Sequence, residues 1–269
     1  MMKKLPIPLL IIVLSLFSCA DGNQDETDDA HRIPAASLIP FSVVNTIPHD
    51  TAAFTEGLSF YKGRLFESTG APTTPANNGT WIGEIDLQSG VVSKKIDMGN
   101  TYFGEGTTFL QDKVYQLTYQ TGKGFVYDAA NFKKIREFSY KGEGWGLTND
   151  GSSLIMSAGT NNLYYIHPDS LNFFRMLAVQ DQNGYVSDLN ELEYIGGYIY
   201  ANKWQTSQIL KIDPATGYVV GVLDFSKLVN EISSKYPYAE EMNGIAHDPE
   251  SKKTFITGKK WPFLYEIRF

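Results

Sequence analysis

The chain has 269 residues, a formal net charge of −7 and a single cysteine, Cys19. The acidic charge argues against nucleic acid as a partner, because neutralisation of phosphates requires a basic face. A single cysteine also excludes a disulfide bond within the chain. The length is ample for one large hydrophobic core.

The N-terminus has the pattern of an export signal. A basic start (residues 1–4) precedes an apolar run (residues 5–17) that is too short to cross a bilayer. We interpret residues 1–18 as a lipoprotein signal peptide, because it ends in LFSC (residues 16–19), which resembles the bacterial lipobox. We therefore predict that Cys19 is lipidated and anchors the protein to a membrane of the bacterial cell envelope, on the periplasmic or extracellular face.

Residues 19–38 are polar, acidic and nearly free of aromatic side chains, which predicts a disordered tether behind the lipidated cysteine. Removal of residues 1–18 takes away Lys3 and Lys4 and moves the formal charge from −7 to −9. Residues 39–269 then form the one folded domain, which we expect to act as a monomer.

Five copies of one unit run through this domain. The copy from Phe103 to Asp128 has an acidic residue, a glycine and then three short alternating strands joined by tight turns. Aligned without gaps, the copies place five residues at equivalent positions, with spacings of 49, 40, 45 and 53: Glu56, Glu105, Trp145, Asn190 and Asn243.

Four copies continue into a fourth strand, whereas the last copy stops at Phe269. A period of 40 to 53 residues with about four strands per copy predicts an all-β, five-bladed β-propeller. We expect residues Phe41–Ile47 to supply the missing strand of the last blade. A β-sandwich and a two-domain all-β protein are the alternatives, but neither predicts equivalent residues at this period.

Loops that enter the innermost strands of a propeller converge at one end of its channel, so we predict the functional site there. The end of the second strand gives a second ring of equivalent positions: Gly70, Tyr119, Gly159, Trp204 and Lys259. A purely structural ring would repeat the same residues. Because these two rings mix carboxylates, amides, a lysine and large aromatics, they predict an asymmetric pocket on a symmetric scaffold.

Six motifs carry a resemblance to a known family: FTEGL (54–58), FGEG (103–106), EGWGLT (143–148), NELE (190–193), NGIA (243–246) and TGKKWPFLYEI (257–267). In this order they resemble the glutaminyl-peptide cyclotransferases of plants and bacteria, over the whole chain after about Phe41. The resemblance implies a five-bladed propeller and an acyltransferase of the aminoacyltransferase class. Such an enzyme converts the N-terminal glutamine of a peptide or protein to pyroglutamate and releases ammonia.

The resemblance also implies a set of site residues: Glu56, Glu105, Trp145, Asn190, Trp204 and Lys259. Two positions depart from the family pattern. Tyr119 stands where the family usually has tryptophan, which changes the polarity of the pocket wall, and Ala158 stands at a family aspartate, which puts a loop contact in doubt.

The chemistry of cyclisation fits these residue types. The reaction needs the substrate amine deprotonated, its carboxamide polarised and the departing nitrogen protonated. We assign the proton transfers to Glu105, a hydrogen bond to the amide oxygen to Asn190, and stabilisation of the oxyanion to Lys259. The remaining residues bind the substrate: Glu56, and the enclosing aromatics Phe54, Phe103, Tyr119, Trp145 and Trp204.

Simpler interpretations stay open for each residue: the two glutamates as turn residues, the tryptophans as core between blades, and Lys259 as an exposed loop lysine. The four histidines form no pair at metal-ligand spacing, which disfavours zinc, so we expect no required cofactor. A structural cation such as calcium in the channel stays open, because backbone carbonyls leave no mark in a sequence.

Two rival functions remain. One is a surface-anchored propeller that binds a ligand without catalysis. The other is a calcium-dependent hydrolase or lactonase, in which Glu56, Glu105, Asn190 and Asn243 would hold the ion; Lys259 on the same face argues against it.

Overall fold

The computed structural model describes residues 33–70 and 79–269, and the first 32 residues, including the predicted signal peptide and Cys19, lie outside them. The described part is one compact unit that begins at Ile33. Its secondary structure is almost entirely β, with one α-helix, α1 (Ser226–Lys235), among the described residues. No helix in this part of the chain is long and apolar enough to cross a membrane.

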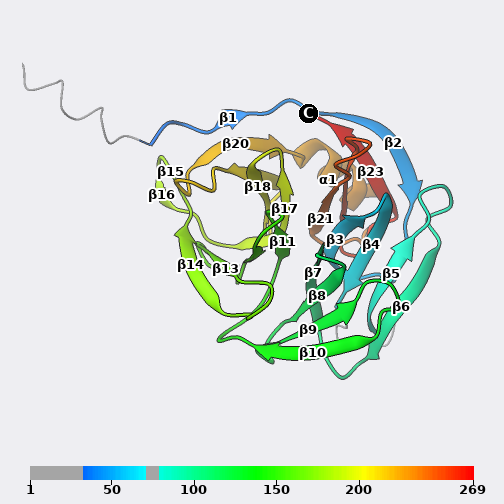
Figure 1. The fold of residues 1–269 in the computed structure, drawn as a ribbon. Coiled ribbons are helices and arrows are strands. Elements are labelled where there is room, and N and C mark those ends of the chain that lie inside the picture. Colours follow the sequence, from blue (N-terminus) through cyan, green and yellow to red (C-terminus); the bar gives the residue numbers. More distant parts are fainter. Residues whose placement is uncertain (1–32, 71–78) are drawn as a thin grey trace, which may run out of the picture. The chain divides into compact units, whose positions relative to one another are not determined.

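Five antiparallel sheets follow one another along the chain (Figure 1). The first comprises β3 (Thr55–Tyr61), β4 (Arg64–Thr69), β5 (Thr80–Ile85) and β6 (Val92–Gly99). The second comprises β7 (Gly104–Leu110), β8 (Lys113–Thr118), β9 (Lys123–Asp128) and β10 (Lys134–Ser139). The third comprises β11 (Leu147–Asn149), β12 (Leu154–Met156), β13 (Asn162–Ile166) and β14 (Phe173–Ala178). The fourth comprises β17 (Leu189–Ile195), β18 (Tyr198–Lys203), β19 (Gln208–Ile212) and β20 (Val219–Asp224), and the fifth contains β21 (Met242–His247), β22 (Thr254–Gly258) and β23 (Phe263–Arg268).

The innermost strands form a closed ring. Contacts run from β3 to β7, β11, β17 and β21 and back to β3. Apolar layers fill the space between neighbouring sheets; for example, Leu117 of the second sheet and Leu147 of the third are buried in one cluster. These features confirm the predicted five-bladed propeller, because each sheet buries its faces only against its neighbours in the ring.

The N-terminal strand completes the last blade, as the strand count predicted. Strand β2 (Ser42–Pro48) pairs antiparallel with β23, from Ser42 opposite Arg268 to Pro48 opposite Phe263. In Figure 1 this blue strand lies beside the red one at the end of the chain. The strand is shifted by one residue from the expected range, and it joins the two ends of the fold through backbone hydrogen bonds.

Three short elements lie outside the repeat. Strand β1 (Ser37–Leu38), which the sequence placed in the tether, pairs in parallel with β20, and the Ile39 N–H donates to the Val222 carbonyl at 2.8 Å. A hairpin of β15 (Gln180–Asp181) and β16 (Gly184–Tyr185) follows the third blade, and α1 follows the fourth. These insertions account for the two spacings, 45 and 53, that follow the third and fourth copies.

Glycines beside the site residues let the inner strands pass close to one another. The Gly106 N–H donates to the Trp145 carbonyl at 2.7 Å, and a Cβ atom on Gly106 would overlap the backbone of Leu147. The Glu-Gly pairs of the motifs therefore reflect close packing around the channel, which fixes the neighbouring glutamate at the channel end.

Candidate active site

β-bulges aim the entry residues at one end of the channel. In the pairing of β7 with β8, Gly104 opposes Thr118 but Thr107 opposes Gln116, so one extra residue lies on the inner strand around Glu105. Similar shifts occur around Glu56, Asn190 and Asn243. A bulge re-aims a side chain out of the regular alternation, and here it turns four entry residues toward the channel.

A repeated backbone hydrogen bond joins the two predicted rings in four of the five blades. In each, the second-ring residue donates its N–H to the carbonyl two residues before the entry residue: Gly70 to Phe54, Tyr119 to Phe103, Trp204 to Asp188 and Lys259 to Glu241. In the third blade, Trp145 donates its N–H to the Ser157 carbonyl instead. The two rings therefore lie at one level because the backbone holds them together.

A cavity of about 190 Å³ opens at this level. Its lining contains all nine residues that the sequence assigned to catalysis and substrate binding: Phe54, Glu56, Phe103, Glu105, Tyr119, Trp145, Asn190, Trp204 and Lys259. Five different sheets or their entry loops contribute to it. The ring closure therefore brings together residues that are up to 205 positions apart in the sequence.

Glu56 is held firmly by two partners. Its Oε1 atom forms a buried ion pair with Lys259 Nζ at 2.9 Å, and its Oε2 atom accepts a hydrogen bond from Asn243 Nδ2 at 3.0 Å. Asn243 also donates to the Thr55 carbonyl at 3.0 Å, so its amide is fixed in turn. Lys259 is 7% exposed, which excludes the interpretation of an exposed loop lysine, whereas Lys260 pairs with Glu240 near the surface.

Glu105 is buried beside this pair but has no such partners. It is 4% exposed, and within residues 33–70 and 79–269 no side chain is hydrogen-bonded to its carboxyl group. Its backbone is nevertheless fixed, because the Ser68 hydroxyl donates to the Glu105 carbonyl at 2.6 Å. The backbone of Glu105 is therefore fixed, while its carboxyl group can bind a ligand.

Burial and neighbouring charges set the ionisation of these groups. Desolvation by burial raises the pKa of Glu105 well above its ordinary value, the negative charges of Glu56 and Glu143 raise it further, and Lys259 opposes them. Burial also raises the pKa of Glu56 to about 7, although Lys259 works against that shift. For Lys259, burial lowers the pKa, but the attraction of Glu56 and Glu105 outweighs it and the net shift is upward.

Aromatic rings form the walls of the cavity. Trp145 meets Trp204 edge to face with ring centroids 5.5 Å apart, and Phe103 contacts both Phe54 at 5.9 Å and Tyr119 at 5.7 Å. The Lys259 ammonium lies over the Phe54 ring, 4.6 Å from its centroid. These rings exclude water from one side of the carboxyl groups, which strengthens electrostatic interactions inside the cavity.

Two glycines in the second set of equivalent positions leave space for the aromatic side chains. A Cβ atom on Gly70 would overlap the Phe103 ring, and one on Gly159 would overlap the Trp145 ring. The absence of a side chain at these positions is therefore part of the pocket.

Asn190 contributes an unused acceptor. It is 3% exposed, and its Oδ1 atom has no hydrogen-bond partner among the described residues. A buried amide oxygen without a partner costs free energy, so a ligand that donates a hydrogen bond there would be stabilised. The sequence assigned Asn190 as a donor to the substrate amide; the orphaned Oδ1 atom shows that the same side chain also offers an acceptor.

The sequence gave three residues that bear on the site no role in the cyclisation. Asn243 was considered as a ring position and as a ligand in the rival calcium site, whereas the structure shows that it fixes Glu56. Glu143 lies within the EGWGLT motif, and its Oε2 atom accepts the Trp145 Nε1–H at 3.0 Å. Glu191 replaces the usual glycine after the entry residue; its carboxyl oxygens accept the N–H groups of Leu58 at 3.2 Å and Ile245 at 2.8 Å. The break in the glycine pattern was the available signal for Glu191.

The described residues contain no group of three or more His, Cys, Asp and Glu side chains with the geometry of a metal site. His49, at the end of β2, is committed elsewhere: its Nε2 atom lies 3.0 Å from Glu67 Oε1 and its Nδ1 atom 2.8 Å from the Trp261 carbonyl. The carboxylate of Glu56 is likewise committed to Lys259 and Asn243.

The fold and the site together define a class: a five-bladed propeller whose channel end holds an aromatic cavity with two buried carboxyl groups and a buried lysine. Comparison with known proteins agrees with this class. The model of the glutamine cyclotransferase family matches residues 10–269, and this chain belongs to that family.

Individual relatives give the same result. The glutaminyl-peptide cyclotransferase of Arabidopsis thaliana is 37% identical over 273 residues, which cover 98% of this chain and 82% of the relative. The crystal structure of Myxococcus xanthus glutaminyl cyclase matches with a TM-score of 0.77 and 36% identity over 87% of this chain and 97% of that one. A chain of a nidogen/laminin complex, at 15% identity, 77% and 73% coverage and a TM-score of 0.51, shares only the fold.

Proposed function

We propose that this protein converts the N-terminal glutamine of peptides to pyroglutamate with release of ammonia, and that Glu105 transfers the protons. One observation carries the assignment: of the two buried carboxyl groups in the cavity, Glu56 is held by Lys259 and Asn243, whereas no side chain in the described part of the chain is hydrogen-bonded to that of Glu105. A proton shuttle needs a carboxyl group that can approach the reacting atoms and change its charge.

The reaction then follows in three steps. The uncharged α-amine of the substrate attacks the carbon of its own side-chain carboxamide, and a bond forms between the two. Glu105, as a carboxylate, accepts a proton from the attacking nitrogen. It then gives this proton to the departing amide nitrogen, which leaves as ammonia, and the carboxylate is restored. Burial raises the pKa of Glu105, which makes its carboxylate a stronger base for the proton of the attacking amine.

Lys259 and Asn190 bind the carboxamide group of the substrate while it reacts. The Lys259 ammonium stabilises the negative charge that develops on the carboxamide oxygen, and Glu56 keeps that ammonium charged and in place. Asn190 holds the carboxamide by hydrogen bonds from its amide and to its free Oδ1 atom. The mechanism needs no metal ion, since all charges and protons are supplied by side chains.

The cavity suits one residue of a peptide. Its volume of about 190 Å³ lies below the roughly 300–1,000 Å³ of pockets that hold drug-sized ligands. Within it, the aromatic rings hold the glutamine side chain folded back toward the α-amine. The nucleophile and the carboxamide belong to the same residue, so fixing this conformer removes much of the entropic barrier.

Ammonia release from a Gln-initiated dipeptide tests the proposal. We expect turnover of this dipeptide and none of the matching Asn-initiated dipeptide, whose shorter side chain would have to close a strained four-membered ring. A chelator should leave the rate unchanged. Loss of turnover with the chelator would support the calcium-dependent alternative, and absence of turnover would support the binding propeller.

For the N-terminal region, we propose the lipid anchor at Cys19 and a location on the cell envelope. The LFSC pattern after an apolar run supports it. In a bacterial host, Cys19→Ala should move the protein from the membrane fraction to the soluble fraction without changing turnover by the propeller. Retention on membranes after this change would point to a different anchor.

A further inference from the structure

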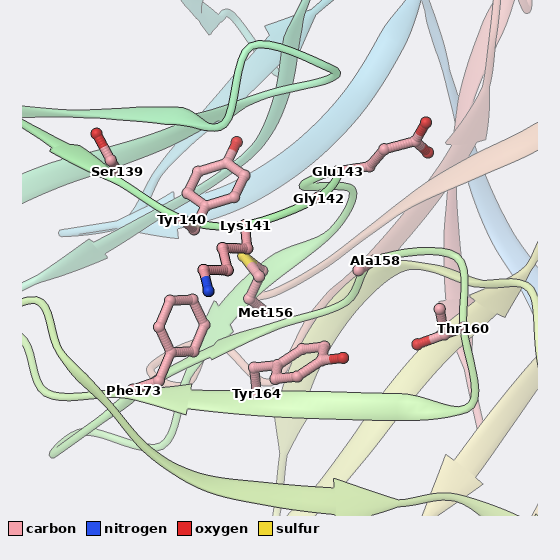
Figure 2. Close-up of a pocket in the computed structure, with 10 residues that line it drawn as sticks. All are labelled: Ser139, Tyr140, Lys141, Gly142, Glu143, Met156, Ala158, Thr160, Tyr164 and Phe173. Carbon is pink, nitrogen blue, oxygen red and sulfur yellow. The ribbon is translucent and has the colours of Figure 1, made fainter.

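A second, larger hollow lies between the second and third blades. Its volume is about 820 Å³, and five side chains make it largely apolar: Tyr140, Met156, Ala158, Tyr164 and Phe173. The rings of Tyr164 and Phe173 meet edge to face, 5.8 Å apart. Figure 2 shows the Phe173 ring on one side of the hollow, Glu143, Ala158 and Thr160 on the other, and the Tyr164 ring between them. An apolar hollow of this size open to solvent is typical of a binding groove.

One end of this hollow borders the candidate active site. Glu143 lines the hollow, and it accepts the indole N–H of Trp145, which lines the active-site cavity. Gly159 lies between two residues that line the hollow, Ala158 and Thr160, and packs directly against the Trp145 ring. The Trp145 indole is therefore the partition between the two spaces.

We propose that this hollow, here called the peptide groove, binds the residues that follow the N-terminal glutamine of the substrate, and that it favours apolar and aromatic side chains. The proposal rests on the proposed function. The cavity holds one residue, so the rest of a peptide must leave through the cavity opening. Each extended residue adds about 3.3–3.6 Å, so the second and third residues reach past Trp145 into the groove.

A charged residue at the end of the groove beside Trp145 also affects which peptides bind. The Glu143 carboxylate accepts the indole N–H of Trp145 at the partition, and Gln120 Nε2 also donates to it, at 3.2 Å. A carboxylate at this position attracts the N–H groups of a peptide backbone and repels an acidic side chain. Lys141 also lines the hollow, so the repulsion by Glu143 is local. The groove therefore favours peptides in which apolar residues follow the glutamine, and Glu143 disfavours an acidic residue next to the partition.

Three amidated tetrapeptides test the preference: Gln-Phe-Phe-Ala, Gln-Ala-Ala-Ala and Gln-Asp-Asp-Ala. For the unaltered protein, we expect kcat/KM for the first to exceed that for the second by about tenfold, and the third to be the poorest. Phe173→Ser should reduce the ratio between the first two peptides severalfold. Phe174→Ser is the matched control, because this neighbouring ring is exposed on the same strand but contacts Tyr165 rather than the groove.

Equal kcat/KM for the phenylalanine and alanine peptides would overturn the proposal, as would equal loss of selectivity in the Phe173 and Phe174 variants. Absence of ammonia from every peptide would instead overturn the proposed activity. The groove is then tested by calorimetry with the two pyroglutamyl product peptides, which need no catalysis to bind. Tighter binding of pyroglutamyl-Phe-Phe-Ala than of pyroglutamyl-Ala-Ala-Ala supports the groove, and equal binding rules it out.

Discussion

Two boundaries between neighbouring blades show how one repeated unit serves opposite purposes. At the closing boundary, between the fifth and first blades, buried polar groups cross from one blade to the other: Lys259 and Asn243 bind Glu56, and His49, which leads into the first blade, bonds the carbonyl of Trp261 in the fifth. At the boundary between the second and third blades, no side chain among the described residues is hydrogen-bonded to the Glu105 carboxyl group, and the space beside Trp145 is hollow. The first boundary holds the ring shut, and the second leaves room for a substrate.

Position in the repeat therefore does not decide a residue's role. Glu56 and Glu105 occupy equivalent bulges, both are buried, and burial raises the pKa of both. Only the neighbouring blade distinguishes them. The fifth blade presents a lysine and an asparagine to Glu56, whereas the third contributes Trp145 to the cavity that Glu105 lines. Five experiments test this contrast, in order of expected effect.

Deletion of residues 41–47 should open the closing boundary. Six paired positions join β2 to β23, and Ile47 is buried, so we expect the free energy of unfolding to fall by about 4–6 kcal/mol. Urea denaturation of the two proteins measures this change. Deletion of residues 37–38 is the control, since β1 pairs at only two positions and should matter much less. Equal stability of the 41–47 deletion and the full chain would show that closure does not depend on β2.

Glu105→Gln should lower turnover by roughly 10²- to 10⁴-fold, because glutamine keeps the shape of the side chain but cannot carry a proton. The loss should appear mainly in kcat, since the aromatic walls and Lys259 remain. Steady-state kinetics with a Gln-initiated peptide measures it.

Glu56→Gln is the matched variant of the second carboxylate and should retain far more activity. An inactive Glu56 variant beside an active Glu105 variant would reverse the two roles. Full activity in both would exclude catalysis by either carboxyl group.

Lys259→Met should cost about 10²- to 10³-fold in kcat, the usual effect of removing one donor to an oxyanion. It also removes the partner of Glu56 at the closing boundary, so a loss of stability should accompany the loss of rate. Lys260→Met controls for charge alone, because that lysine pairs with Glu240 near the surface. Comparable loss of kcat in both variants would argue against a direct role for Lys259.

His49→Gln should make the stability of the closing boundary less dependent on pH. Burial opposes protonation of His49, but Glu67 outweighs it, and the net pKa is raised. A histidine whose pKa is raised on folding stabilises fully below the unfolded pKa of about 6.5, and this stabilisation is lost as pH rises through the folded value. Between pH 6 and 8, the melting temperature should therefore fall more in the unaltered protein than in the variant. Parallel plots of melting temperature against pH for the two proteins would contradict this role of His49.

The smallest effect concerns the acidic limb of the pH–activity profile. Glu56 raises the pKa of Glu105 by its negative charge, whereas Lys259 lowers it. Glu56→Gln removes the negative charge that raises the pKa of Glu105 and leaves the positive charge of Lys259 that lowers it. The pKa of Glu105 should therefore fall, and the acidic limb of the kcat/KM profile should move to lower pH. A limb that stays in place would show that the two carboxyl groups do not interact.

The architecture and the residues that line the cavity could be predicted from the sequence. The repeat of 40 to 53 residues set the number of blades, and the missing fourth strand after Phe269 implied that β2 closes the ring. The same alignment gave seven of the nine residues that line the cavity, and the family motifs added Phe54 and Phe103. This was possible because a propeller repeats one local structure, so equivalent positions in the sequence become equivalent positions around the channel.

What each of these residues can do could not be predicted in the same way. The freedom of Glu105, the binding of Glu56 by Lys259 and Asn243, and the span of Glu191 across the inner strands depend on contacts between blades. The hollow beside Trp145 likewise arises between two sheets and leaves no period in the sequence. A local repeat specifies each blade, but charge, hydrogen bonding and open space at a blade boundary depend on side chains that are distant in the chain and meet only when the ring closes.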